Sequence, residues 1–165
     1  MDAEREIPGR LRPSDAVVAV QFTALAGLLW PGRGRWGLPR PARRVAQGAV
    51  VAGTAASLLG LVHLGRDLTV RVRPRTGSTL HTSGAYAVTR NPVYAGLLLS
   101  SAGFAALRRR QEPLIAFFVL SGVLHVKALL EERQLRATFG AAYGDYAARV
   151  PRLFGMPRRR VGNGR

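Results

Sequence analysis

Four uncharged apolar stretches alternate with polar stretches that carry nearly all of the arginines. They cover residues 16–30, 45–64, 92–107 and 113–126, and the last stays apolar beyond Lys127 as far as Leu130. A helix that crosses a membrane needs roughly 20 apolar residues, within a range of about 17–25. The second and fourth stretches reach that length, whereas the first and third need flanking residues or a thin bilayer. The pattern therefore predicts four helices.

These stretches lack the polar face of a soluble amphipathic helix. Such a helix carries charged residues every three or four positions along one side, and none of the four stretches contains a charge. The second stretch is dense in Ala, Gly and Ser, which let helix backbones approach closely in a bilayer or in a tightly packed core. We predict an all-α protein, a polytopic membrane bundle of about four transmembrane helices, with a soluble helical bundle as the alternative.

The composition excludes several classes of protein. Among 165 residues, Lys and Arg total 25 and Asp and Glu total 9, which gives a formal net charge of +16. This charge suits nucleic-acid binding, but the long uncharged stretches do not, so we predict no nucleic-acid partner. The absence of Cys excludes disulfide scaffolds, thiolate zinc sites and Cys nucleophiles. His63 and His125 have no second His at ligand spacing, so no metal site is predicted.

The polar stretches set the expected domain limits and the orientation in the membrane. We expect an N-terminal polar segment at 1–15, a membrane domain at 16–156 and a basic tail at 157–165. Four spans would place both termini and the middle loop, 65–91, on one side of the membrane. That side carries the larger number of arginines, so we predict that it faces the cytoplasm. The expected location is the bacterial inner (plasma) membrane, with membrane lipid as a partner.

The first ordered polar pattern covers residues 83–96 and leads into the third apolar stretch. Asn91-Pro92 is typical of a helix start, because Asn is a favoured N-cap and Pro a favoured first helical residue. Tyr86, Arg90 and Tyr94 would then gather around the N-terminus of that helix. Free backbone N–H groups and the positive end of the helix dipole make this place suitable for an anion or a carboxylate.

The second ordered pattern begins where the fourth apolar stretch ends. Glu131 and Glu132 are two of the five acidic residues in the segment 65–165. Two adjacent acids at a membrane boundary are costly unless they are paired or used, so both are candidate functional residues. Lys127 lies one helical turn before Glu131 on the same face, so the two charges can meet. The alternative is a solvated helix end whose acids pair with neighbouring arginines.

Together the two patterns resemble the family of isoprenylcysteine carboxyl methyltransferases and phospholipid methyltransferases, which are small integral membrane enzymes. The resemblance extends from about residue 71 to residue 151. The matching residues are Leu80-His81-Thr82-Ser83-Gly84-Ala85-Tyr86, Arg90-Asn91-Pro92-Val93-Tyr94-Ala95-Gly96, Glu131-Glu132 with Leu135, Phe139-Gly140 with Tyr143 and Tyr146, and Val150-Pro151.

The resemblance implies methyl transfer from S-adenosylmethionine, with a cofactor pocket at the cytoplasmic face and a catalytic part at 71–151. The acceptor would be a lipophilic small molecule or a prenylated substrate, such as a prenylcysteine-like carboxylate or a lipid, whose apolar tail enters between helices from the bilayer.

A carboxylate acceptor needs only a cation to hold it, whereas an amine acceptor needs a base. The predicted catalytic residues are Lys127, Glu131 and Glu132, of which Glu131 and Glu132 are the nearest candidate bases. The residues implied to bind the acceptor are Lys127 and Arg133. The residues implied to line the cofactor pocket are Leu80, His81, Gly84, Tyr86, Asn91, Pro92, Tyr94 and Glu131.

Two other functions fit parts of the sequence. A membrane reductase that uses NADPH is one, because sterol-reductase-like proteins end in a comparable Pro-x-Tyr-x-Gly and terminal-Tyr pattern; binding of NADPH in place of S-adenosylmethionine would favour it. A small basic membrane protein that binds anionic lipid through its arginines is the other. The second alternative leaves the ordered positions of Tyr86, Asn91, Tyr94 and Glu131 unexplained.

Overall fold

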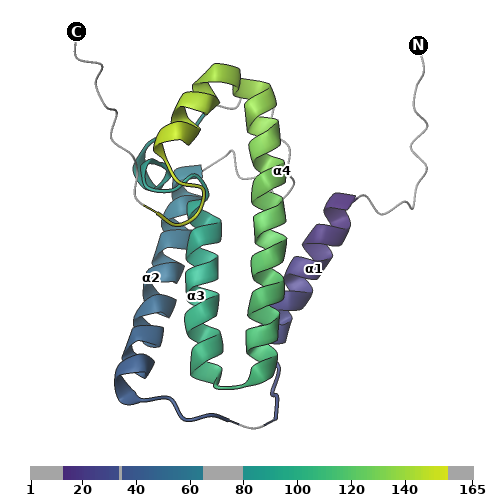
Figure 1. The fold of residues 1–165 in the computed structure, drawn as a ribbon, viewed down its shortest axis with the longest axis vertical. Helices are drawn as coiled ribbons and strands as arrows, with labels where there is room; N and C mark the ends of the chain where they lie inside the picture. The colour runs from purple at the N-terminus through teal and green to yellow at the C-terminus, as the bar shows by residue number, and fades with distance from the viewer. Residues whose placement is uncertain (1–12, 34, 65–79, 156–165) are drawn as a thin grey trace.

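The protein forms an all-helical bundle in a computed structural model that describes residues 13–33, 35–64 and 80–155. Figure 1 shows the long helices running side by side in alternating directions, with a tight turn joining the last two. No strand occurs in the described ranges, so the predicted fold class is confirmed in this respect. The helices are α1 (Pro13–Leu28), α2 (Arg40–Leu64), the short 3-10 helix η2 (Gly84–Ala87), α3 (Pro92–Arg108) and α4 (Gln111–Arg149).

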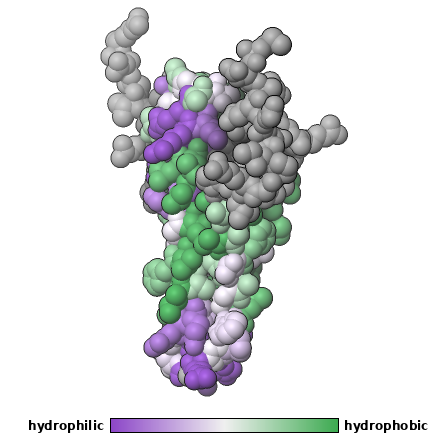
Figure 2. Space-filling model, turned by 90° about the vertical axis from the view of Figure 1, so that its right-hand side faces the viewer, coloured by the Kyte–Doolittle hydropathy of each residue, from purple (hydrophilic) through white to green (hydrophobic). Residues whose placement is uncertain are grey.

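Two of the helices, α2 and α4, are long and apolar enough to cross a membrane. The apolar part of α1 covers only Asp15–Leu28, and α3 has 17 residues, so the predicted number of about four spans is supported for two. The most apolar stretch of α2 is only 17% buried, and that of α4 only 33%. In the face seen in Figure 2, hydrophobic side chains cover the middle of the bundle and hydrophilic ones gather toward its ends. An outward-facing apolar band between polar ends is what a lipid-embedded bundle presents.

Helices α2 and α3 pack against each other along a line of glycines. A Cβ atom placed on Gly53 would lie 2.4 Å from the Ser100 backbone nitrogen, and one on Gly96 would lie 2.4 Å from the Gly53 carbonyl oxygen. Ser57 adds a hydrogen bond across the same contact, donating from Oγ to the Val93 carbonyl oxygen at 3.0 Å. The small residues of the second apolar stretch therefore allow the two backbones to touch.

The other long contact joins α1 to α4, and α3 completes the core between them. The buried apolar cluster contains Ala24 and Leu28 of α1, Leu98 of α3, and Leu120 and Leu124 of α4. Leu120 and Leu124 have no exposed surface. The cluster holds the three helices together below the polar end of the bundle, where α3 begins.

The end of the chain folds back over this polar end of the bundle. Gly140 has a φ of 51° and a ψ of −123°, which interrupts α4, and Figure 1 shows the last part of the helix turning back over α2 and α3. Tyr143, Tyr146 and Val150 are buried there, and the Tyr146 hydroxyl donates to the Tyr86 carbonyl oxygen at 2.7 Å. Of the expected domain limits, the tail at 157–165 and most of the segment at 1–15 lie outside the described residues.

Candidate functional site

Three helices contribute polar side chains to one cluster at the end of the bundle where α3 begins. Tyr94, in the first turn of α3, donates a hydrogen bond from its hydroxyl to Oε1 of Glu131 on α4. Lys127, one turn earlier on α4, places Nζ 5.3 Å from the centre of the Tyr94 ring and donates to Oε1 of Gln21 on α1 at 3.0 Å. We call these four residues, Gln21, Tyr94, Lys127 and Glu131, the Tyr94 site.

The Tyr94 site holds opposite charges in a largely dehydrated place. Lys127 is buried, at 5% exposure, and Glu131 is half-buried one helical turn away. Charges in such surroundings interact more strongly than in water, because there is little solvent to screen them. Each is also held by a neutral partner, Gln21 for the ammonium and Tyr94 for the carboxylate. Tyr94 therefore meets both charged groups, the Glu131 carboxylate through its hydroxyl and the Lys127 ammonium through its ring.

Tyr86 lies beside this site, on the short helix η2. Burial raises the pKa of Tyr86 to about 12, and the nearby negative charge of Glu131 adds to the shift. Tyr86 therefore keeps its hydroxyl proton at neutral pH and can donate it. His81 packs against Tyr86 with ring centroids 6.1 Å apart. Gly84, the first residue of η2, has a φ of +60°, and a Cβ there would lie 2.2 Å from Nε2 of His63.

Glu132 belongs to a different cluster from Glu131. Its Oε1 lies 3.1 Å from Nη1 of Arg90. Arg152 grips the same carboxylate with two hydrogen bonds, from Nε at 2.7 Å and from Nη2 at 2.9 Å. These hydrogen bonds raise the pKa of Arg152 above its usual value, so its charge persists at any pH the protein meets. Glu132 is thus bound by two arginines, whereas Glu131 is bound to Tyr94.

Asn91 is the residue before α3, as predicted, and Pro92 is the first residue of the helix. The expected capping by its side chain is wrong, since that side chain makes no capping hydrogen bond. Instead, its Nδ2 donates to the Arg152 carbonyl oxygen at 3.1 Å. The Asn91 side chain therefore binds the segment after α4 and does not cap the N-terminus of α3.

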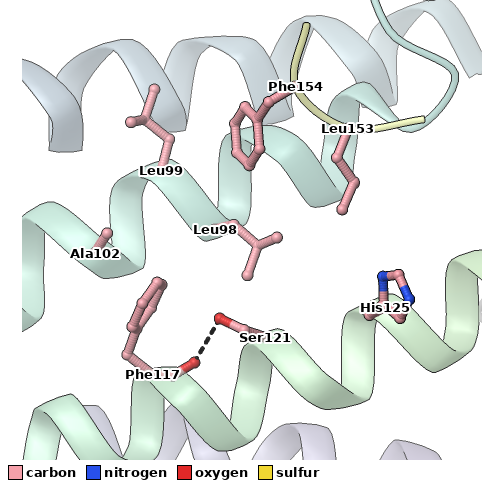
Figure 3. A pocket seen from close by; sticks show the side chains of 8 residues that line it. All are labelled: Leu98, Leu99, Ala102, Phe117, Ser121, His125, Leu153 and Phe154. Carbon is pink, nitrogen blue, oxygen red and sulfur yellow. Dashed lines mark hydrogen bonds between the residues drawn. The ribbon is translucent and has the colours of Figure 1, made fainter. Parts of the chain in front are cut away.

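An apolar cavity of about 380 Å³ lies between α3, α4 and the chain that follows α4. Figure 3 shows Leu98 pointing into it from α3, with Phe117 and His125 on the facing helix. Ser121 turns its hydroxyl toward its own helix, where it donates to the Phe117 carbonyl oxygen at 2.8 Å. The lining residues are Leu98, Leu99, Ala102, Phe117, Ser121, His125, Leu153 and Phe154. The cavity can hold a hydrocarbon group of modest size.

The structure brings together some of the residues predicted from the sequence and separates others. Tyr94 contacts both Glu131 and Lys127, and Tyr86 lies near enough to Glu131 to feel its charge. Glu132 is paired with arginines, and Arg133 is exposed on the surface of α4. Leu80 packs against the buried tyrosines at the end of the chain, and buried Pro92 lies against α2 near Gly60. Within the described part of the chain, no three His, Cys, Asp or Glu residues lie close enough to hold a metal ion.

Sequence reasoning missed two residues of these clusters, Gln21 and Arg152. Gln21 is a polar amide within an uncharged stretch, and polar groups at membrane depth commonly have a partner or a function. That signal could have found it. Nothing in the sequence around Arg152 indicates its role, because its partner Glu132 lies 20 positions earlier in the chain. Only the bend at Gly140 brings the two together.

Comparison with known proteins gives one informative similarity. No family model matches the chain. The chain is 30% identical over 105 residues to protein-S-isoprenylcysteine O-methyltransferase B of Arabidopsis thaliana. The match covers 62% of this chain and 53% of the plant protein, so the chain spans about half the length of this curated relative. The class of protein indicated by this similarity is the methyltransferases.

Proposed function

We propose that the protein is an S-adenosylmethionine-dependent methyltransferase that acts on a lipophilic acceptor at a membrane surface. The observation that carries this proposal is the contact between Tyr94 and Glu131 beside Lys127, which joins the two polar patterns of the sequence in one place. The similarity to an isoprenylcysteine O-methyltransferase supports the same chemistry. We further propose membership of that enzyme family, with the catalytic part at 71–151.

The groups around the Tyr94 site fit a positively charged nucleoside. When bound, S-adenosylmethionine supplies a methyl group on a sulfonium sulfur that is already activated for transfer. Glu131 provides a carboxylate, and Tyr86 and Tyr94 provide aromatic rings; both kinds of group attract a cation. The Tyr94 hydroxyl fixes the position of the Glu131 carboxylate. We therefore assign cofactor binding to Tyr86, Tyr94 and Glu131, together with the adjoining segment that contains Leu80, His81 and Gly84.

Lys127 is the candidate for holding the acceptor. Lys127 and Glu131 are four residues apart on one face of α4, so their backbones are about 6 Å apart along the helix axis, and both side chains contact Tyr94. A carboxylate bound to Lys127 would therefore face a methyl group bound near Glu131. Gln21 holds the ammonium in place from α1. With a carboxylate acceptor no proton has to be removed, so the chain needs only to align the reacting atoms and exclude water. This proposal favours Lys127 over the exposed Arg133 for acceptor binding.

The apolar part of the acceptor is assigned to the cavity between α3 and α4. Leu98 lines the cavity and lies one turn after Tyr94 on the same face of α3. The cavity and the Tyr94 site are therefore neighbours along this face. We propose that all four long helices lie in the inner membrane, because α1 and α3 pack along the two helices long enough to span it. The Tyr94 site then lies at the cytoplasmic end, as expected from the distribution of arginines.

The proposal is tested by incubating the purified protein in lipid nanodiscs with S-adenosylmethionine labelled in its methyl group. Membrane lipid extract and S-farnesylcysteine serve as separate acceptors. We expect label in an organic-soluble product that base treatment releases as methanol, because a carboxylate acceptor gives a methyl ester. Lys127→Met should raise the acceptor KM about tenfold, while Lys127→Arg, which keeps a positive charge that binds carboxylates, should retain most activity. Transfer no greater than with heat-denatured protein for both acceptors would reject the proposal.

A further inference from the structure

The short segment that follows α4 is fastened to the start of α3 by a set of hydrogen bonds. We call residues Val150–Gly155 the C-terminal strap. The Arg90 backbone N–H donates to the Pro151 carbonyl oxygen at 2.9 Å. The carbonyl oxygen of Arg152 accepts two hydrogen bonds, from Thr89 Oγ1 at 3.0 Å and from Asn91 Nδ2 at 3.1 Å. Three successive residues before α3 thus hold two successive residues of the strap.

The side chain of Arg152 is also held by hydrogen bonds, in addition to those that its carbonyl oxygen accepts. It makes a two-pronged contact with Glu132, which is itself only 5% exposed and also pairs with Arg90. A carboxylate shared by two guanidinium groups is a strong and geometrically specific contact. It is costly to disrupt, since removing the carboxylate leaves two cations facing each other. Arg152 is therefore fixed from two sides at once.

The residues that follow Arg152 directly form one wall of the apolar cavity. Leu153 and Phe154 line it on the side of Leu98 and face α4, which carries Phe117, as Figure 3 shows. Phe154 is 61% exposed, and Leu153 packs against the main apolar cluster. Neither belongs to a helix, so the position of this wall depends on the anchoring of Arg152. A shift of the strap would change the width of the cavity without moving α3 or α4.

We propose that Thr89, Asn91 and Glu132 are positioning residues for the acceptor. They hold Arg152, and Arg152 in turn fixes the C-terminal strap as one wall of the cavity that binds the hydrocarbon tail. This inference rests on the proposed function and changes two of the assignments predicted from the sequence. Asn91, implied to contact the cofactor, and Glu132, implied to be catalytic, would instead decide which apolar tails fit. Cofactor binding would stay with Tyr86, Tyr94 and Glu131 and with the adjoining segment that contains Leu80, His81 and Gly84.

The position of the strap can be measured without any acceptor, because the chain contains no Cys. A single Leu153→Cys variant would be labelled with a maleimide in nanodiscs, alone and combined with Thr89→Val, Asn91→Ala or Glu132→Gln. Thr89→Val is the mildest change, since it keeps the shape of the side chain and removes only the hydroxyl, which donates to the Arg152 carbonyl oxygen and accepts a long hydrogen bond from the Asn91 backbone N–H. We expect labelling to accelerate about fivefold with Thr89→Val or Asn91→Ala and more with Glu132→Gln. Unchanged labelling in all three would overturn the proposal.

A second measurement separates a positioning role from a cofactor-binding role. We expect Thr89→Val and Asn91→Ala to raise the KM for S-farnesylcysteine about fivefold, while the Kd for S-adenosylhomocysteine stays within twofold of the original protein. Weakening of S-adenosylhomocysteine binding by Asn91→Ala to the same extent as by Glu131→Gln would refute the proposal. If the unsubstituted protein binds no S-adenosylhomocysteine, the proposed function fails, and the labelling experiment still decides whether these residues hold the strap.

Discussion

Replacing Glu131 by Gln is expected to weaken binding of S-adenosylhomocysteine about 100-fold and to reduce methyl transfer by at least as much. The change keeps the shape of the side chain and still offers an oxygen to the Tyr94 hydroxyl, but it removes the negative charge. A hydrogen bond to a charged group contributes about 1.5–3 kcal/mol, and every 1.4 kcal/mol corresponds to about a tenfold change in affinity. Lys127 would also lose the carboxylate that lies one turn away in a buried place.

Asp145→Asn is the matched control for this experiment. Asp145 is exposed and lies beyond the bend at Gly140, so its replacement removes the same charge at the same end of the bundle without touching the Tyr94 site. Isothermal titration calorimetry in detergent would measure both variants, and thermal unfolding would verify that each is folded. A Glu131→Gln protein that binds S-adenosylhomocysteine as tightly as the Asp145→Asn protein would show that Glu131 does not hold the cofactor.

The second large effect is expected at the contact between α2 and α3. A Cβ on Gly53 would meet three backbone atoms of α3 at 2.4–2.9 Å, so the substitution Gly53→Ala can be accommodated only if the two helices separate. Overpacking of this kind typically costs about 1–3 kcal/mol, and we expect about 3 kcal/mol because backbone atoms cannot rotate away. The change in the free energy of unfolding would be measured by titrating the protein in mixed micelles with a denaturing detergent.

Gly48→Ala provides the comparison within the same helix. A Cβ at Gly48 would meet nothing within 4 Å, so this substitution should leave packing unchanged. Since Ala favours a helix over Gly by about 0.8–1.0 kcal/mol, it should stabilise the protein slightly. The two substitutions are thus expected to have opposite signs. Equal effects at Gly48 and Gly53 would mean that α2 and α3 do not touch along the glycine line.

Local features of the fold could be predicted from the sequence because their causes are local. The start of α3 at Asn91-Pro92 follows from the backbone preferences of these two residues, and the helices follow from the length of the apolar stretches. The bend in α4 could not be predicted in this way. Gly140 allows the positive φ found there, but a glycine at this position is also compatible with a plain loop or a continued helix.

The two adjacent acids illustrate the limit of sequence reasoning for the candidate site. Glu131 and Glu132 look equivalent in the chain, and both were expected to be catalytic. Successive helical residues point about 100° apart, so one faces Tyr94 and the other faces Arg90 and Arg152. Which partner each one meets depends on the packing of α3 and on the strap after α4. Those are contacts between distant segments, and no local pattern encodes them.

Parallel calorimetric titrations of the unsubstituted protein with S-adenosylhomocysteine and with NADPH decide which of the two nucleotides the Tyr94 site binds. We predict a saturable heat for S-adenosylhomocysteine, with a Kd in the micromolar range, that disappears in a Tyr94→Ala, Glu131→Ala double variant, and no saturable heat for NADPH. Saturable binding of NADPH alone would contradict the proposed methyltransferase function and favour a reductase. Binding of S-adenosylhomocysteine that is unchanged in the double variant would contradict the assignment of the Tyr94 site.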